Sequence, residues 1–235
     1  MIVFRVSTLA CVSLVVLVAV LVISPLSYAQ QKGPVTDAGE RMRLYDDYVE
    51  MIEESSFSNL PWQFVGPTNI SGRMTDIAVV EPRGENYTVY VAGASGGVWK
   101  TTNEGTTWEP IFDHAASASI GEVTIAPSNP DIVWVGTGEA NIFRSSMAGS
   151  GVYKSIDAGE TWAHMGLTAT HTIPRIIVHP TNPDIVYVAA SGHEWTDNPE
   201  RGVYKTTDGG ETWEKILYIS ERTGAIDLVM DPSDA

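Results

Sequence analysis

Short apolar runs alternate with turn residues from about residue 72 onward, in an order that repeats along the chain. Runs of about four to eight residues bounded by turn signals are typical of β-strands. The first run of each repeat is followed by a proline (82, 127, 180 and 232): Met74–Val80, Glu122–Ala126, Arg175–His179 and Ala225–Met230. Second runs follow, twice after an Asn-Pro-Asp turn: Thr88–Ala92, Ile132–Val135 and Ile185–Ala189. The pattern predicts an all-β chain.

Each repeat contains one octamer of the form Ser/Thr-x-Asp/Asn-x-Gly-x-Thr-Trp: Thr101–Trp108, Ser155–Trp162 and Thr206–Trp213. Its Asp or Asn can accept hydrogen bonds from turn amides, and its glycine tolerates positive φ. Thr-Trp then starts the next strand with two β-forming residues. We interpret each octamer as a structural turn rather than a site. The tryptophans lie 54 and 51 residues apart, a period typical of stacked repeat units.

The repeat predicts four-stranded blades at about 72–115, 120–167 and 173–219, with a fourth that begins at 224. The octamer tryptophans Trp108, Trp162 and Trp213 are expected to be buried between sheets. Residues 62–65 resemble the strand after each octamer, so we expect them to complete the last blade of a longer chain. Its remaining blades would be partners of these three, because an open stack exposes unpaired strand edges.

The first 29 residues predict a signal peptide. Arg5 precedes an apolar run from Leu9 to Leu26, and the small residues Ser27 and Ala29 suit cleavage before Gln30. The protein is therefore expected to be periplasmic or secreted, with no membrane span after cleavage. An uncleaved membrane anchor is the alternative, because the run is near the length that spans a bilayer.

Residues 30–60 are expected to form a flexible leader and one amphipathic helix. Apolar residues recur at helical spacing between Met42 and Ile52, with Thr36 or Asp37 as the cap and an end near Ser55. Because its polar face is acidic, the helix is expected to pack on the blades rather than on a membrane.

Composition removes several function classes. Cys11 is the only cysteine and lies in the predicted signal peptide, which excludes disulfides and cysteine chemistry from the mature chain. The formal net charge of −15 disfavours nucleic acid as a partner. We expect no cofactor. The loop histidines His114, His171 and His193 come from separate blades, so no metal site is predicted.

The octamers and their flanks resemble the BNR/Asp-box family of β-propellers, with Asn103 as a mild departure from Asp. In that family the box lies away from the catalytic or binding centre, so the resemblance implies the fold and leaves activity open. The longer context over residues 61–235 is similar to exported bacterial proteins described as sortilin-like or glycosyl-hydrolase-like, with WD/YVTN-like repeats. The resemblance is carried by Gly72–Ala78, Gly136–Asn141 and His179–Asp184.

The links between second and third strands are expected to form the working face, together with the blade-to-blade links. The second and third blades have long polar links there, 136–150 and 190–201, where four residues suffice in the first. Long loops on a rigid scaffold often carry function. The predicted ligand-binding residues are Glu139, Asn141, Arg144, His193, Glu194 and Trp195.

Each of these residues also has a structural interpretation. Glu139 and Asn141 could hold the loop backbone, and Arg144 could pair with Glu139. The residues His193, Glu194 and Trp195 could form a surface turn, with Trp195 covering a neighbouring blade.

Two functions from different classes follow. The favoured one is a sortilin-like module that binds a peptide or carbohydrate. The alternative is a glycoside hydrolase with paired carboxylates, for which Glu139, Glu194 and Asp197 are weak candidates. The xyloglucanase-like enzymes carry a catalytic Asp in the turn after the second strand, where this chain has Ala94. Alanine can neither ionise nor donate a proton, so that mechanism is absent from this blade.

Overall fold

The computed structural model describes residues 37–60, 72–82, 84–141 and 146–231. The predicted signal peptide, the flexible leader, the strand expected at 62–65 and Arg144 lie outside the described residues. The described residues all fall within one unit, Asp37–Ala235.

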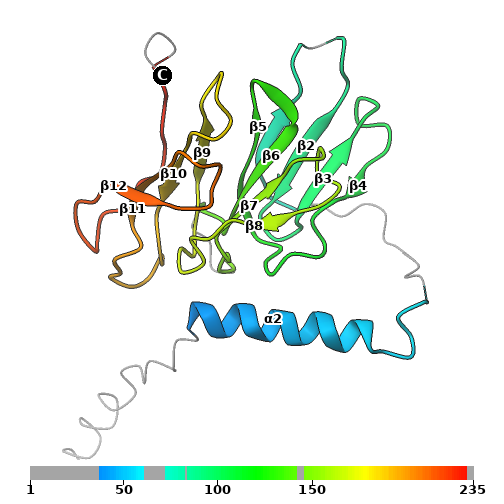
Figure 1. Ribbon diagram of the computed structural model, residues 1–235, viewed down its shortest axis with the longest axis horizontal. Coiled ribbons are helices and arrows are strands. Elements are labelled where there is room, and N and C mark those ends of the chain that lie inside the picture. The colour runs from blue at the N-terminus through cyan, green and yellow to red at the C-terminus, as the bar shows by residue number, and fades with distance from the viewer. Residues whose placement is uncertain (1–36, 61–71, 83, 142–145, 232–235) are drawn as a thin grey trace, which may run out of the picture. The chain divides into compact units, whose positions relative to one another are not determined.

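Within the described residues, twelve strands form three antiparallel sheets, each with its strands in chain order (Figure 1). The first holds β1 (Met74–Val79), β2 (Val89–Gly93), β3 (Val98–Thr101) and β4 (Glu109–Pro110). The second holds β5 (Ile120–Ala126), β6 (Asn129–Thr137), β7 (Val152–Ser155) and β8 (Ala163–His164). The third holds β9 (Arg175–Val178), β10 (Val186–Ala190), β11 (Gly202–Thr206) and β12 (Glu214–Leu217). The predicted fold class is confirmed.

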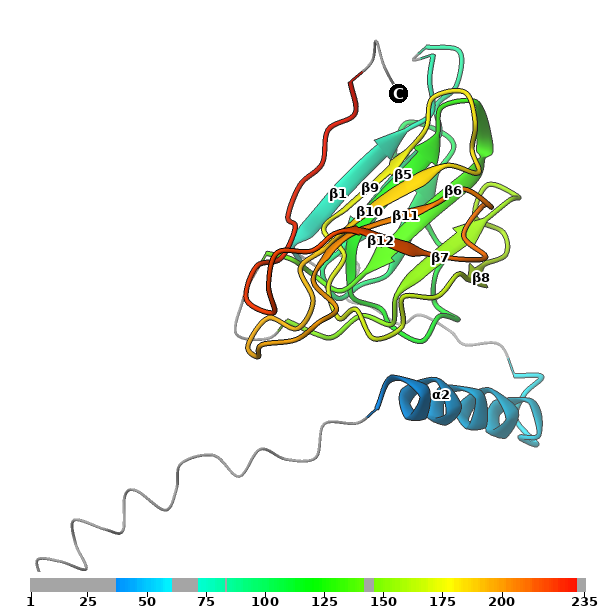
Figure 2. The same cartoon turned by 60° about the vertical axis from the view of Figure 1, so that its left-hand side comes forward.

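The innermost strands β1, β5 and β9 lie next to one another, with β5 in contact with both β1 and β9 (Figure 2). Residues 225–230, expected to be a fourth innermost strand, form no strand. A strand requires a hydrogen-bonded partner, and no second strand of that blade lies in the described chain. The segment is held to the third sheet by the Ala225 amide, which donates to the Ala190 carbonyl at 3.1 Å, and by Asp227, which pairs with Arg175 at 3.1 Å.

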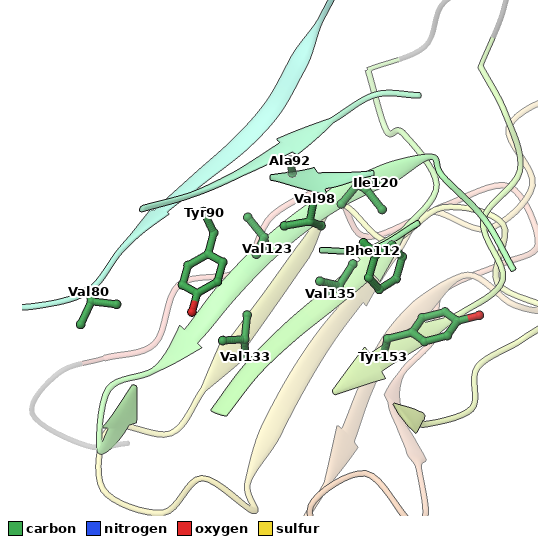
Figure 3. Packing of buried hydrophobic residues seen from close by; sticks show 10 residues of the cluster. All are labelled: Val80, Tyr90, Ala92, Val98, Phe112, Ile120, Val123, Val133, Val135 and Tyr153. Carbon is green, nitrogen blue, oxygen red and sulfur yellow. The ribbon is translucent and has the colours of Figure 1, made fainter. Parts of the chain in front are cut away.

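Apolar side chains fill the space between neighbouring sheets. Between the first and second, Tyr90 packs with Val98, Val123 and Val135, and Phe112 meets Tyr153 edge-on (Figure 3). Between the second and third, the central residue is Trp134, which is fully buried with Ile176 and Val188. These faces are complementary because alternate residues of each strand point to the same side.

Each octamer forms the predicted turn. In the second, the Ser155 hydroxyl donates to Asp157 at 2.7 Å and accepts from the Gly159 amide at 2.8 Å, while Asp157 accepts from the Thr161 amide at 2.9 Å. Hydrogen bonds from Thr161 lower the pKa of Asp157 to about 2. The positive φ of Ala158 (56°) and Gly159 (94°) closes the turn.

The expected burial of the octamer tryptophans is only partly correct. Trp162 and Trp213 are half-buried against the preceding sheet, whereas Trp108 is 40% exposed. The reason is position, because each octamer packs on the sheet before its own. No sheet in the described part of the chain precedes the first one. The fully buried aromatic side chains include Tyr90 and Trp134 on the second strands and Phe112 just after β4.

Helix α2 (Ala38–Glu53) begins at Asp37, whose carboxylate accepts from the Gly39 and Glu40 amides. The predicted amphipathic helix is confirmed, although none of its residues is fully buried. Arg41 donates to the Gly149 carbonyl at 2.8 Å and to the Thr168 carbonyl at 3.1 Å. Among the described residues, no helix combines the length and apolarity needed to cross a bilayer.

Charged residues occupy the same position on the three innermost strands. Asp76, Glu122 and Arg175 pair across to Ala92, Gly136 and Ala189 on the second strands. They line a hollow of about 380 Å³. Glu122 is 5% exposed, lies 3.4 Å from Arg175 and hydrogen-bonds to Asp76. Burial, and then the charge of Asp76, raise the pKa of Glu122 to about 8.

We expect the stability of the protein to fall as the pH rises from about 5 to about 8 because of Glu122. The folded protein holds a proton there that the unfolded chain, with a carboxyl pKa of 4.5, releases. The free energy of unfolding should drop by about 2–4 kcal/mol over this range. Urea unfolding at both pH values measures it. Glu122→Gln should flatten the dependence, and the exposed Glu109→Gln should leave it unchanged. An equal slope in Glu122→Gln would contradict the assignment.

Candidate functional site

The candidate site lies on one face of the sheets, here called the loop-rich face. It comprises the links β2–β3, β6–β7 and β10–β11, and the sheet-to-sheet links at 111–119, 165–174 and 218–224. The octamers lie at the opposite ends of the strands. This separation follows from the antiparallel order of each sheet, which sends alternate links to alternate faces.

The backbone at the start of the β6–β7 link is fixed by close contacts. Gly138 has φ +88°, and a side chain there would collide with the His171 carbonyl. The Gly138 amide donates to the Ser119 carbonyl at 2.7 Å, and the Glu139 amide donates to the Ser119 hydroxyl at 3.1 Å. Thr137 donates its hydroxyl to the Gly151 carbonyl at 2.6 Å. These contacts fix the position of the Glu139 backbone.

Glu139 forms a two-point ion pair with Arg73, which precedes β1. The Arg73 Nε donates to Oε1 at 2.7 Å and its NH2 donates to Oε2 at 2.6 Å. The Glu139 side chain is fully buried, and that of Arg73 is 42% exposed. The hydrogen bond raises the pKa of Arg73. Arg144, the partner considered from the sequence, lies outside the described residues.

Sequence reasoning missed Arg73 as a site residue. The sequence did show an arginine directly before an innermost strand, and that end of the strand lies at the loop-rich face. Such a position can reach a carboxylate on the next sheet, but the link that supplies the carboxylate cannot be identified without the structure.

Glu194, on the β10–β11 link, lies within the electrostatic influence of Glu139. Burial raises the pKa of Glu194, and the Glu139 carboxylate raises it further. Its Oε1 is buried and has no hydrogen-bond partner among the described residues. The second and third sheets thus bring these two predicted residues together. A carboxyl group in such surroundings favours its protonated form.

The β10–β11 link is braced from inside by two residues that the sequence did not single out. Asn198 is buried and donates to the His193 and Thr196 carbonyls at 3.1 and 2.7 Å. Arg201 donates to the same two carbonyls at 2.6 and 3.2 Å. The brace leaves Trp195 at the tip, 76% exposed. Within the described residues, Trp195 covers no neighbouring sheet.

The remaining predicted residues are placed separately. His193 stacks on His171 with ring centroids 3.6 Å apart, and its Nε2 lies 3.1 Å from the Ala169 carbonyl. Burial, His193 and then Arg41 lower the pKa of His171 to about 4. His114 does not join this stack and accepts from Tyr45 through its carbonyl.

Asn141 and Asp197 lie at the surface. Asn141 is exposed, and Asp197 pairs with Arg222 at 3.3 Å. Among the described residues, no three His, Cys, Asp or Glu side chains group as metal ligands would.

Removing the Arg73 side chain should destabilise the protein more than removing an exposed arginine. Arg73→Ala would leave the buried Glu139 carboxylate without its counter-charge. Arg43→Ala is the matched control, because Arg43 pairs with two carboxylates on the exposed face of α2 and such pairs contribute little. Thermal melts compare them. Adding Glu139→Gln to Arg73→Ala should recover part of the loss, and no recovery would indicate that packing of Arg73 dominates.

Comparisons with known proteins agree with this architecture. The family model described as Sortilin-Vps10 (sortilin, neurotensin receptor 3) matches residues 96–225. A curated relative, the xyloglucanase of Hypocrea jecorina (strain QM6a), is 24% identical over 186 residues, which are 70% of this chain and 22% of the relative.

Two solved structures are also similar. The crystal structure of an ancestral GH74 enzyme has a TM-score of 0.50 and 21% identity, over 63% of this chain and 18% of that one. The GH74 enzyme of Niastella koreensis has a TM-score of 0.44 and 22% identity, over 61% and 22%.

The chain therefore spans only about a fifth of the length of these relatives. The family model, in contrast, matches more than half of this chain, from the third strand of the first sheet to the end of the third sheet. The chain belongs to the Sortilin-Vps10 family.

Proposed function

We propose that this chain is part of an exported propeller that binds a carbohydrate on its loop-rich face. The observation that carries the proposal is Trp195, an exposed aromatic ring at the tip of a link that Asn198 and Arg201 hold in place. A rigid, exposed aromatic side chain costs little conformational entropy on binding and offers a large apolar face. Export rests on the predicted signal peptide.

The polar groups around Trp195 suit a sugar ligand. Trp195 would stack on the C–H face of a sugar ring. Glu194, whose pKa is raised by burial, would hydrogen-bond to a hydroxyl group of the sugar. The Arg73 guanidinium, oriented by Glu139, would add a charge-assisted hydrogen bond. Glu139 itself acts as a positioning residue, because both of its oxygens contact Arg73.

The relatives support the same ligand class. A curated relative is named a xyloglucanase, which makes xyloglucan oligosaccharides the first ligands to test. The family description includes a neurotensin receptor, so a peptide is the alternative ligand.

A glycoside hydrolase is the second candidate, favoured by one observation. Burial and the neighbouring Glu139 carboxylate raise the pKa of Glu194, and a general acid needs a shift in this direction. Two features weigh against this role. Glu139 is buried and engaged by Arg73, and Asp197 is paired with Arg222. Neither carboxylate is placed to activate a water molecule or attack a sugar.

One screen separates these functions. The secreted chain is applied to an array of neutral and acidic glycans and peptides, and each soluble hit is incubated and analysed for released reducing ends. We expect binding of a glycan without hydrolysis. Release of reducing ends that Glu194→Gln abolishes would establish the hydrolase. Binding of peptides alone would replace the carbohydrate proposal.

A further inference from the structure

Two side chains of helix α2 hold it on the loop-rich face. The Arg41 guanidinium donates from NH1 to the Gly149 carbonyl at 2.8 Å and from NH2 to the Thr168 carbonyl at 3.1 Å. One turn later in the helix, the Tyr45 hydroxyl donates to the His114 carbonyl. The three carbonyls belong to three different links of this face. Because no residue of α2 is fully buried, these polar contacts supply much of its attachment.

Arg41 is a partly buried cation that contacts two neutral carbonyls on the links. Its Nε is buried and has no hydrogen-bond partner among the described residues. Burial lowers the pKa of Arg41, and Asp37, at the start of the same helix, opposes this shift. A partly desolvated cation with neutral partners is weakly held, so a second positive charge beside it would favour release of the helix.

Two histidines lie stacked beside this contact. The rings of His171 and His193 have centroids 3.6 Å apart and planes within 7° of parallel. The amide of Gly149, whose carbonyl accepts from Arg41, donates to the His171 carbonyl at 2.7 Å. The Nε2 of His193 lies 3.1 Å from the Ala169 carbonyl, which can only accept, so this nitrogen is the donor. The stack therefore joins the β10–β11 link to the link at 165–174.

The surroundings of the stack keep it uncharged. Burial, the charge of His193 and then that of Arg41 lower the pKa of His171 to about 4. Glu194 follows His193 on the β10–β11 link, but burial and the Glu139 carboxylate raise the pKa of Glu194. It is therefore poorly suited to neutralise a protonated stack. The repulsion is mutual, because a proton on His171 disfavours Arg41 as much as Arg41 disfavours the proton.

Attachment of α2 is therefore linked to pH. While α2 is attached, His171 takes up a proton only near pH 4. When α2 leaves, the Arg41 charge leaves with it, and the pKa of His171 moves toward its ordinary value of 6.5. The released state thus binds more protons than the attached state between pH 6.5 and pH 4. Attachment is strongest above this range and weakens as the pH falls through it.

We propose that helix α2 is an acid-released clasp on the loop-rich face, with the stacked pair of His171 and His193 as its sensor. At neutral pH the uncharged stack lets Arg41 hold the helix in place. Protonation of the stack displaces Arg41, and the helix then uncovers the carbonyls of Gly149 and Thr168 beside the β10–β11 link. The inference goes beyond the proposed function and depends on no ligand of this face.

Spin labels on the complete chain measure the attachment of α2. Cys11 is the only cysteine, so Cys11→Ser gives a background in which Glu50→Cys on α2 and Glu211→Cys on the third octamer are labelled. We expect one narrow distance at pH 7 and a second, broad population at pH 4 that disappears on return to pH 7. The equilibrium should shift about tenfold for each unit by which release raises the pKa of His171. A second pair, Glu109→Cys with Glu211→Cys, reports on the sheets alone and should keep its distance.

Three variants assign the effect to the stack. His171→Phe keeps a ring on His193 but cannot take up a proton, so α2 should stay attached at pH 4. His114→Phe is the matched control, because it replaces an exposed imidazole on a link that α2 also contacts, and acid release should persist. Arg41→Gln should free part of the helix at pH 7 and raise the pKa of His171, as measured by proton NMR.

The proposal fails if the distance between α2 and the sheets is the same at pH 7 and pH 4, or if His171→Phe still releases the helix in acid. It also fails if Arg41→Gln leaves the pKa of His171 unchanged, because the two charges would then not interact. A changed distance between labels at positions 109 and 211 would identify unfolding of the sheets as the cause and would overturn the clasp. Every readout is made without ligand, so failure here leaves the carbohydrate proposal standing.

Discussion

Replacing Trp134 by alanine should lower the free energy of unfolding by about 3–5 kcal/mol, the range for buried aromatic residues. Trp134 is fully buried between the second and third sheets and meets Trp213 edge-on at 6.3 Å. The Lys154 ammonium lies 5.0 Å from its ring. The substitution would open a cavity between the second and third sheets. Denaturant unfolding of the purified protein measures the loss.

Two further variants sharpen this result. The indole N–H of Trp134 has no acceptor among the described residues, so Trp134→Phe removes an unsatisfied donor while keeping most of the ring. It should cost much less than alanine. Trp195→Ala, at an exposed position, should leave the unfolding midpoint almost unchanged. Equal losses in Trp134→Ala and Trp195→Ala would contradict the packing described between these sheets.

Much of the fold could be predicted because residues close together in each repeat determine its turns and strands. Each octamer contains its own turn chemistry, and the hydrogen bonds of Ser155, Asp157 and Gly159 need no distant residue. The helix could be predicted for the same reason, since Asp37 caps its own first turn. Local signals of this kind do not depend on the rest of the molecule.

Burial of the tryptophans could not be predicted, because it depends on which sheet each octamer meets. Trp108 and Trp162 end octamers of the same pattern, yet Trp108 is 40% exposed and Trp162 is half-buried. The strand wrongly predicted at 225–230 has a similar cause, since its pattern is that of a strand but strand formation needs a partner. Position within the stack, rather than sequence, decides both.

The sequence could predict which loops carry the candidate residues, but not which side chains contact one another there. Link length indicated the loops that carry Glu139, Glu194 and Trp195. The partner of Glu139 was missed because Arg73 is 66 residues away in sequence and belongs to another sheet. The brace by Asn198 and Arg201 was missed because short-range side chain to backbone bonds leave no periodic pattern.

Binding at the loop-rich face should depend strongly on Trp195. Its ring is a large, exposed apolar group, and Asn198 and Arg201 brace the link that carries it. Trp195 is therefore the expected hot spot. Truncation of such a residue typically costs 2 kcal/mol or more, equivalent to an affinity loss of about thirtyfold. Glu194→Gln should weaken binding less, because the amide retains a donor and an acceptor.

The most direct test is a titration calorimetry comparison of the chain, Trp195→Ala and Trp108→Ala with the best glycan from the array. Trp108 is the matched control, an exposed tryptophan on the octamer side of the sheets. We predict that Trp195→Ala raises the Kd by well over tenfold, with an unchanged melting temperature, and that Trp108→Ala leaves the Kd unaltered. An unchanged Kd in Trp195→Ala, or a loss confined to Trp108→Ala, would contradict a ligand site on the loop-rich face.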